Sequence, residues 1–272
     1  MIAWIVTAAC VLCVWLLLML PAFPKRGWAA FYGKKYFAHR GLHDENVCEN
    51  SMQAFRLAVQ AGCGIELDVH MTQDGQLCVF HDDTLKRLCG REEAIRDMTM
   101  EALRLVPLPD GQTIPALEEV LEWVRGRVPL IVEIKSPEIG NCAVSEKLWQ
   151  CLENYRGDYL VQSFDPFQLR WFKKHAPWVI RGQLAQKCRY EGPFRFRYLL
   201  QMMAGNLLFN RISAPDYIAY RQEDTKKYCY RMMRRVYRPG LAVWTVRSAA
   251  EAEKMKEISD AIIFENFRPE KM

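Results

Sequence analysis

Two histidines and three carboxylates occupy positions from which acid–base chemistry and metal binding could be carried out together. His39 and His81 each follow a short apolar run, and Glu66, Asp68 and Glu133 lie in two further apolar runs. Each run predicts a β-strand, and the polar residues mark its end. Polar residues gathered at the carboxyl ends of successive strands are how a parallel α/β barrel builds an active site. The chain has only five histidines, so two of them at such strand ends are more than background.

The three carboxylates have a pattern typical of metal ligands. Glu66 and Asp68 are two residues apart, so on a strand their side chains share one face of the sheet. Glu133 would approach from the neighbouring strand. Three hard oxygen ligands favour one divalent cation, Mg²⁺ or Ca²⁺, over zinc. The alternatives are a solvated strand face for the first pair and, for Glu133, a structural ion pair with Lys135, because a lone buried carboxylate is costly.

The two histidines at strand ends are candidates for proton transfer. Histidine titrates near neutral pH, so a pair can serve as general base and general acid. The alternative for each is a structural histidine whose hydrogen bonds are satisfied in the fold. His43, His70 and His175 are expected to be bystanders. The sequence does not distinguish which of His39 and His81 is the base.

The motifs that carry these residues follow one another in a defined order. They are His39-Arg40-Gly41, Glu49-Asn50-Ser51, Gly64-Ile65-Glu66-Leu67-Asp68-Val69, Thr72-Gln73-Asp74-Gly75, Val79-Phe80-His81-Asp82, Glu133-Ile134-Lys135, Ser163-Phe164-Asp165 and Trp244-Thr245-Val246. In that order they resemble the glycerophosphodiester phosphodiesterase family. The resemblance implies a (β/α)8 TIM barrel with a small insertion after the second strand, and hydrolysis of glycerophosphodiesters to glycerol phosphate and an alcohol. It also implies that Glu66, Asp68 and Glu133 bind the metal and that His39 and His81 are the catalytic pair.

Other residues near these motifs are candidates for substrate binding. Arg40 offers a fork of donors to phosphate oxygens. Lys135, two residues beyond the third carboxylate, would point the same way and add positive charge near the phosphate. Glu49 and Asn50 are possible site-lining residues, although Asn50 has the alternative role of capping the helix that follows. Trp244 either walls the pocket or fills the core.

Three positions depart from the family pattern. Cys48 stands where the family usually has Pro, Arg247 where Asn usually follows Trp-Thr-Val, and Glu265-Asn266 where the last strand commonly ends in Thr-Asp. All are expected at the rim of the barrel mouth, so they bear on substrate choice more than on reaction type. The alternatives to a glycerophosphodiesterase are a lysophospholipase D acting on membrane lysophospholipids, a catalytically silent membrane-bound barrel, and a lipase that releases a cyclic phosphate.

The pattern of strands and helices predicts one barrel domain over residues 36–272. About 245 residues follow the N-terminal segment, close to the ~250 typical of this fold. Short apolar strands alternating with helices predict a parallel sheet, and residues 85–113 predict an excursion from the barrel. Strands are predicted at 36–38, 65–69, 77–80, 129–132, 159–161, 178–184, 241–244 and 261–264, and helices at 50–61, 116–125, 142–154, 166–175 and 248–257.

Residues 1–23 carry no charged side chain and predict a transmembrane anchor. Twenty helical residues rise ~30 Å, the thickness of bilayer hydrocarbon. A signal peptide, the alternative, would need a basic start and a small-residue cleavage site. Residues 24–35 are predicted to be a basic linker. The positive-inside bias then predicts a single-pass protein of the cell membrane with its barrel on the cytoplasmic side, and the scattered cysteines agree with a reducing compartment.

The segment 181–240 is strongly basic. It holds ten Arg and three Lys against two Glu and two Asp, a net charge of +9. Aromatic and aliphatic side chains interleave with arginine in residues 193–203 and continue in Leu207-Leu208-Phe209, a pattern typical of a membrane interface. We therefore expect membrane lipid as a partner beside a glycerophosphodiester or lysophospholipid substrate. The alternatives are the charged outer face of a barrel helix and a nucleic-acid patch, and no nucleic-acid partner is expected.

Overall fold

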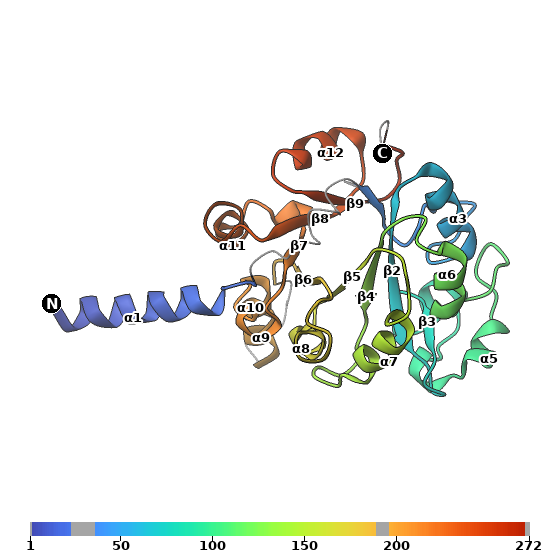
Figure 1. Ribbon diagram of the computed structural model, residues 1–272, viewed down its shortest axis with the longest axis horizontal. Coiled ribbons are helices and arrows are strands. Elements are labelled where there is room, and N and C mark those ends of the chain that lie inside the picture. The colour runs from blue at the N-terminus through green and yellow to red at the C-terminus, as the bar shows by residue number, and fades with distance from the viewer. Residues whose placement is uncertain (1, 23–35, 189–195, 270–272) are drawn as a thin grey trace.

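The computed structural model describes residues 2–22, 36–188 and 196–269 (Figure 1). Eight parallel strands in this part of the chain close into a barrel, because β1 pairs with both β9 and β2. The predicted (β/α)8 barrel is therefore confirmed. Its strands are β1 (Tyr36–Ala38), β2 (Gly64–Met71), β4 (Leu130–Ile134), β5 (Tyr159–Ser163), β6 (Arg181–Ala185), β7 (Tyr217–Arg221), β8 (Gly240–Val246) and β9 (Ala261–Phe264).

Alternate residues of each strand face different cores. On β2, Ile65, Leu67 and Val69 belong to the outer core that the sheet shares with the helices. On β4, Ile131 belongs instead to a second core inside the barrel, formed almost wholly by strand residues. Since side chains alternate along a strand, Glu133 points to the same side as Ile131. Pairing of β2 with β4 places Asp68 opposite Glu133, so the carboxylates gather on the inner face.

Helices cover the outside of the barrel (Figure 1). Those that follow the strands are α3 (Met52–Ala61), α6 (Leu117–Val124), α7 (Ala143–Leu152), α8 (Pro166–His175), α9 (Phe196–Gly205), α10 (Asn210–Ser213), η2 (Gln222–Asp224), α11 (Tyr228–Met232), η3 (Met233–Tyr237) and α12 (Ala249–Lys256). Ser51 caps α3 by accepting a hydrogen bond from the backbone N–H of Ala54. Gly62 ends that helix with φ at 74°, a left-handed conformation that glycine adopts without strain.

The predicted excursion after the second strand is confirmed. Strand β3 (Leu77–Val79) runs antiparallel to β2. The chain then forms α4 (Lys86–Cys89), η1 (Ile95–Asp97) and α5 (Met100–Arg104) before it returns to the barrel. Phe80, Leu85, Ile95, Leu103 and Ile114 are buried in a small core that is formed mainly by this excursion and also includes Cys48. Its own apolar core lets it hold the loop that follows β3 at the barrel mouth.

The segment 181–240 contains a barrel strand that the sequence did not predict. Strand β7 lies within it, and the residues from Tyr217 to Tyr220 are buried. Arg181, which opens β6, is only 2% exposed and pairs with Asp216 at 3.1 Å. At least one of the basic residues that suggested a membrane interface therefore forms a buried ion pair within the fold. The residues Pro193–Arg195 of the predicted interface lie outside the described part of the chain.

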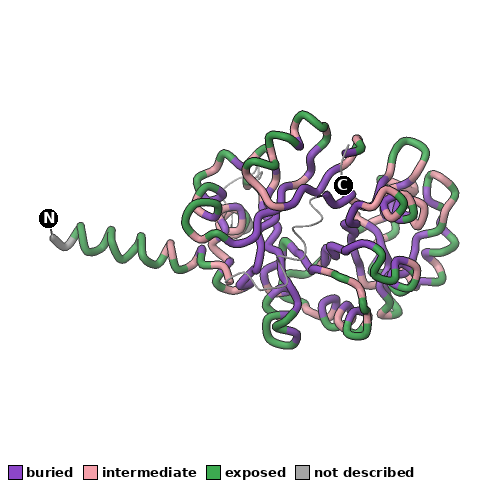
Figure 2. The backbone as a smooth tube through the Cα atoms, turned by 45° about the horizontal axis from the view of Figure 1, so that its top comes forward, coloured by how far each residue is buried: buried purple, intermediate pink, exposed green. Residues whose placement is uncertain are grey.

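Helix α1 (Ile2–Leu18) extends away from the barrel and is exposed over most of its length (Figure 2). Its last turn is joined to the barrel by a hydrogen bond from Tyr237 Oη to the carbonyl of Leu16, 2.8 Å, and the next residue by one from Asn210 Nδ2 to the carbonyl of Met19, 3.0 Å. Trp15 packs on Tyr228 with ring centroids 5.4 Å apart.

The predicted transmembrane anchor over residues 1–23 is wrong. Among the described residues, no helix has both the length and the apolar character that a bilayer crossing requires. The 17 residues of α1 rise only ~26 Å, short of the ~30 Å hydrocarbon layer. The prediction of a single-pass protein of the cell membrane with a cytoplasmic barrel depended on this anchor and is therefore wrong as well. The predicted basic linker, residues 24–35, lies outside the described residues.

Candidate active site

Three buried carboxylates meet on the inner face of the barrel, two from β2 and one from β4. Glu66, Asp68 and Glu133 are 1%, 0% and 6% exposed, and each offers an oxygen within 4.8 Å of the others. Glu66 accepts hydrogen bonds from the backbone N–H of Arg40, 3.1 Å, and from Gln162 Nε2, 3.2 Å. The structure thus brings together the three side chains that the sequence predicted as metal ligands.

Two cationic side chains lie against this group, and both stabilise the ionised form of Asp68. The Lys135 ammonium is 3.0 Å from Asp68 Oδ1 and also bonds Glu133, while Arg40 Nε is 3.5 Å from Asp68 Oδ2. Burial alone would raise the pKa of Asp68, but Lys135 and then Arg40 outweigh it and hold that pKa below its usual range. Burial likewise opposes the charge of Lys135, yet the two carboxylates raise its pKa.

The other two carboxylates carry negative charge that is poorly compensated. Burial, followed by the charges of Asp68 and Glu133, raises the pKa of Glu66. Burial is also the main cause that raises the pKa of Glu133, even though Lys135 opposes it. Asp68 Oδ1 faces the Lys135 ammonium at 3.0 Å, and this one ammonium is shared with Glu133. A hard divalent cation would supply what this arrangement lacks, so the residues present fit such an ion. The ion pair between Lys135 and Glu133, considered as a structural alternative, is also present.

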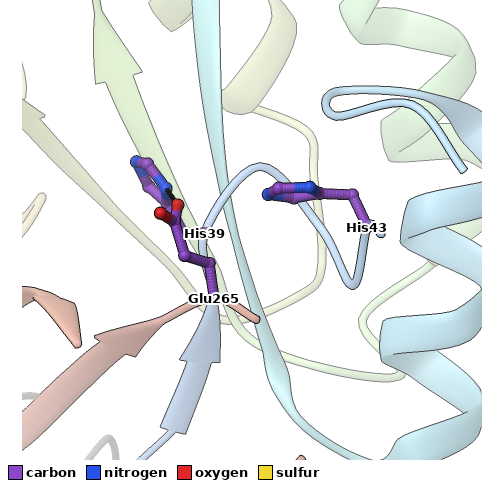
Figure 3. A group of neighbouring side chains, drawn as sticks. All are labelled: His39, His43 and Glu265. Atoms are coloured by element: carbon purple, nitrogen blue, oxygen red, sulfur yellow. Dashed lines mark hydrogen bonds and ion pairs between the residues drawn. The ribbon is translucent and has the colours of Figure 1, made fainter. Parts of the chain in front are cut away.

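His39 is joined to a carboxylate from the last strand (Figure 3). Its Nδ1 is 2.5 Å from Glu265 Oε2. Because an ionised carboxylate can only accept, Nδ1 carries the proton and Nε2 is left for exchange with a ligand. Arg247 Nε donates to the other oxygen, Oε1, at 2.8 Å. Burial lowers the pKa of His39 despite this hydrogen bond. Burial opposes the ionisation of Glu265, but the hydrogen bond from His39 prevails and lowers its pKa to about 2.

His81 has a matching partner of its own. Its Nδ1 is 2.6 Å from Asp82 Oδ1, and Arg87 Nε donates to Asp82 Oδ2 at 2.5 Å. Arg87 Nη2 also donates to Glu49 Oε1 at 2.6 Å, and Glu49 accepts from Arg40 Nη1 at 2.7 Å. Burial again lowers the pKa of the imidazole. Each histidine is therefore oriented by a carboxylate, and each carboxylate is held by an arginine.

The remaining predicted residues differ in their relation to this centre. Asn50, 2% exposed, donates to Asp68, whereas Ser51 caps the helix. Trp244 stands apart on β8, where Nε1–H donates to the carbonyl of Ala219 at 3.1 Å. It remains partly exposed, and its ring meets that of Phe164 edge to face at 5.7 Å. Trp244 therefore closes the interior core and also borders the barrel mouth.

The expected bystander histidines have different surroundings. His70 Nε2 is 3.1 Å from the carbonyl oxygen of His81, so it supports the loop that presents a catalytic candidate. His43 lies beside His39 and Glu265, with ring and carboxylate atoms within 4.8 Å of one another (Figure 3). His175 stacks on Trp171 with ring centroids 4.4 Å apart.

Several residues of the centre had no predicted role. They are Asp82, Arg87, Gln162, Tyr217, Arg247 and Glu265. A signal existed for two of them, because Gln162 and Glu265 end or directly follow an apolar strand, where barrel sites form. For Tyr217 no such signal existed. Its hydroxyl, on β7, donates to Gln162 Oε1 at 3.2 Å. It thereby supports the side chain that donates a hydrogen bond to Glu66.

Comparisons with known proteins agree with this geometry. Residues 39–267 match the model of the glycerophosphoryl diester phosphodiesterase family. A glycerophosphodiester phosphodiesterase of Caldanaerobacter subterraneus is 36% identical over 160 residues, which cover 55% of this chain and 65% of that protein. A human lysophospholipase D is 32% identical over 146 residues, 47% of this chain and 43% of that protein. The matches thus span less than two thirds of the length of these curated relatives.

The fold has close counterparts among solved structures. An Oleispira antarctica phosphodiesterase in complex with the product sn-glycerol-3-phosphate superposes with a TM-score of 0.70. It is 21% identical, and the superposition covers 86% of this chain and 93% of that one. At this identity the likeness concerns the barrel fold alone.

Proposed function

This chain belongs to the glycerophosphoryl diester phosphodiesterase family, and from that premise we propose that it hydrolyses a glycerophosphodiester to glycerol phosphate and an alcohol. One observation carries the proposal. Three buried carboxylates lie together, the charges of two histidines act on one of them, Asp68, and each histidine is bonded through Nδ1 to a further carboxylate. A phosphodiester resists attack by water because it is an anion. The reaction needs charge neutralisation, a deprotonated nucleophile and a protonated leaving group.

Glu66, Asp68 and Glu133 would hold one divalent cation, Mg²⁺ or Ca²⁺. Such a cation, when bound, neutralises the charge of the diester and orients it. Asn50 fixes one oxygen of Asp68, and Gln162 fixes one oxygen of Glu66. These hydrogen bonds aim the carboxylates, which is the role that supporting residues have around metal ligands.

Arg40 and Lys135 would supply positive charge to the phosphate oxygens. Both lie against Asp68, at the edge of the carboxylate group where a bound anion would be placed. Glu49 holds Arg40 through Nη1, so that its guanidinium keeps one orientation. Trp244, with Phe164 against its ring, would border the space for the glycerol or alcohol group.

His39 and His81 would exchange protons through Nε2. Each has its Nδ1 on a carboxylate, which fixes the ring and the tautomer. One imidazole accepts a proton from the attacking water, and the other donates a proton to the departing alkoxide.

Phosphorus NMR of the reaction tests this proposal. The purified chain is incubated with glycerophosphocholine and Mg²⁺, Ca²⁺ or EDTA. We expect metal-dependent formation of glycerol phosphate and choline, abolished by EDTA and by Asp68→Asn. The matched control is Asp97→Asn, since Asp97 is 71% exposed and pairs with Arg96 in the excursion. Turnover that ignores EDTA would overturn the metal assignment, a cyclic phosphate product would indicate the lipase, and no turnover would indicate a silent barrel.

A lysophospholipid is the second candidate substrate, because the chain is similar to a human lysophospholipase D. The scissile bond is the same in both classes, so the centre described above would serve either. Incubation with lysophosphatidylcholine separates them. Release of choline and lysophosphatidate faster than hydrolysis of glycerophosphocholine would favour the lipid substrate, and with it the predicted membrane lipid partner. The opposite ratio would favour the deacylated headgroup ester.

A further inference from the structure

Two of the positions at which this chain departs from the family pattern are in contact with each other. Arg247 stands where the family usually has Asn, and Glu265 belongs to the Glu265-Asn266 pair that stands where the last strand commonly ends in Thr-Asp. Their side chains form a hydrogen-bonded ion pair, with Arg247 Nε 2.8 Å from Glu265 Oε1. The other oxygen of the same carboxylate bonds His39. The two departures therefore act on one group, and that group is a catalytic candidate.

We propose that Glu265, held by Arg247, is a positioning residue that fixes the ring of His39 with Nδ1 protonated and Nε2 presented to the phosphodiester. This inference rests on the proposed function for its kinetic consequences. In this role Glu265 touches neither the substrate nor the metal. It acts only through His39, in the same way as Asp82 acts through His81.

The backbone holds this carboxylate in a defined place. His39 N–H donates to the carbonyl of Phe264 at 2.8 Å, and Glu265 N–H donates to that of Val246 at 3.0 Å. These bonds continue the pairing of β1, β9 and β8 past the strand ends. The side chains of His39 and Glu265 are 13% and 12% exposed, so the bond between them is shielded from water and stronger than a surface contact.

A metal site formed by His39, His43 and Glu265 is the competing interpretation, because their atoms have suitable spacing. Two observations favour the hydrogen-bonded arrangement. Both oxygens of Glu265 already accept hydrogen bonds, one from His39 and one from Arg247. The positive charges of Arg247 and Arg40 also lie near the same place, and they would repel a second cation.

The charges that face His39 give the sign of the pH effect. They are Glu265 after β9, Arg40 and His43 in its own loop, and Asp68 on β2. Burial and Arg40 lower the pKa of His39, whereas Glu265 raises it. Neutralising Glu265 therefore lowers the pKa of His39 further. Whichever role His39 has, one limb of the pH–rate profile must move to lower pH.

Steady-state kinetics on glycerophosphocholine test the inference. We expect Glu265→Gln to lower kcat by roughly 10- to 100-fold, the usual effect of removing such a partner, with KM nearly unchanged and one limb displaced to lower pH. Glu265→Asp, which keeps the charge, should recover part of the rate. As a single variant, Arg247→Ala should lower kcat. Added to Glu265→Gln, it should cause no further loss, because both residues act through one group.

Glu223→Gln is the matched control. Glu223 also approaches Arg247, at 3.8 Å, but it has no contact with His39 and its side chain is 43% exposed. We expect this variant to keep the wild-type kcat and pH profile. Wild-type kcat and pH profile in Glu265→Gln would overturn the inference, and so would a lower kcat in which neither limb moves.

Nitrogen NMR of the imidazoles separates this inference from the proposed function. We expect His39 in the wild-type chain to carry its proton on Nδ1, with a far-downfield proton signal that Glu265→Gln removes. A wild-type His39 protonated on Nε2 alone would overturn the positioning role even if the chain hydrolyses the diester. The expected tautomer in a chain that hydrolyses neither substrate would support the positioning contact and refute the proposed function.

Discussion

Asn50 donates a hydrogen bond of 2.9 Å from Nδ2 to Oδ2 of Asp68, and both side chains are buried. Its own Oδ1 lies 3.4 Å from the backbone nitrogen of Asp68, so the amide contacts this residue twice. The backbone of Asn50 has φ at 53°, in the left-handed region that Asn tolerates better than most residues. Helix capping is left to Ser51. Asn50 thus orients a predicted metal ligand.

Removal of the Asn50 amide is expected to weaken metal binding. Asn50→Gly keeps the left-handed backbone, since glycine adopts it freely, but leaves Asp68 without its neutral partner. We expect the affinity for Mg²⁺ or Ca²⁺ to fall by roughly 10- to 100-fold, measured by calorimetric titration. Asn46→Gly, an exposed asparagine in the same loop, is the control. Equal affinities in the two variants would show that Asn50 does not position the carboxylate.

Metal binding is expected to stabilise the fold. A ligand that binds only the native chain at 100 times its Kd adds about 2.7 kcal/mol to the free energy of unfolding, or about 5 to 10 °C in Tm for a domain of this size. The raised pKa of Glu66, caused by burial and neighbouring carboxylates, predicts such a gain. Thermal unfolding with Mg²⁺ and with Ca²⁺ should show it in the wild-type chain and lose it in Asp68→Asn. No gain with either ion would mean that Lys135 and Arg40 balance the three carboxylates without a metal.

The loop that carries Arg40 is pressed against α3, and glycine makes this approach possible. Gly41 has φ at 81°, and a Cβ there would lie 2.8 Å from Cβ of Ala54. Gly75, in the turn between β2 and β3, has φ at 74° and nothing within 4 Å. Gly75→Ala should cost only the backbone strain, about 1–2 kcal/mol. Gly41→Ala should add an overpacking cost of about 1–3 kcal/mol. Urea unfolding compares the two variants, and equal losses would argue against the close contact.

The acidic strand was predictable because its signal is local. Ile65, Leu67 and Val69 fill the outer core, and the two carboxylates between them necessarily face the barrel interior. Helix α3 was equally predictable, because a capping serine precedes its apolar face. In such segments, neighbours along the chain determine both the element and the direction of each side chain.

The partners of the histidines were less predictable, because they depend on barrel closure. Glu265 and His39 are 226 positions apart, and only the pairing of β1 with β9 brings them together. Strand β7 was missed for a different reason. The basic residues around it suggested a surface, but Arg181 is paired with Asp216 inside the fold. The error over residues 1–23 arose from apolar composition alone, which does not set the length of the helix that forms.

Kinetics of the two histidine variants on two diesters test the central claim most directly. Glycerophosphocholine needs a proton for its leaving alkoxide, whereas the corresponding glycerol phosphate ester of 4-nitrophenol does not. We predict that His39→Ala and His81→Ala each lower kcat on the choline ester by roughly 10²- to 10⁴-fold. Turnover of the nitrophenyl ester should be restored in one variant, whose missing histidine is then the general acid. The other variant should stay impaired, and its missing histidine is the general base. His175→Ala, on the exposed end of α8, should match the wild type throughout. Wild-type turnover of glycerophosphocholine by both His39→Ala and His81→Ala would contradict the account.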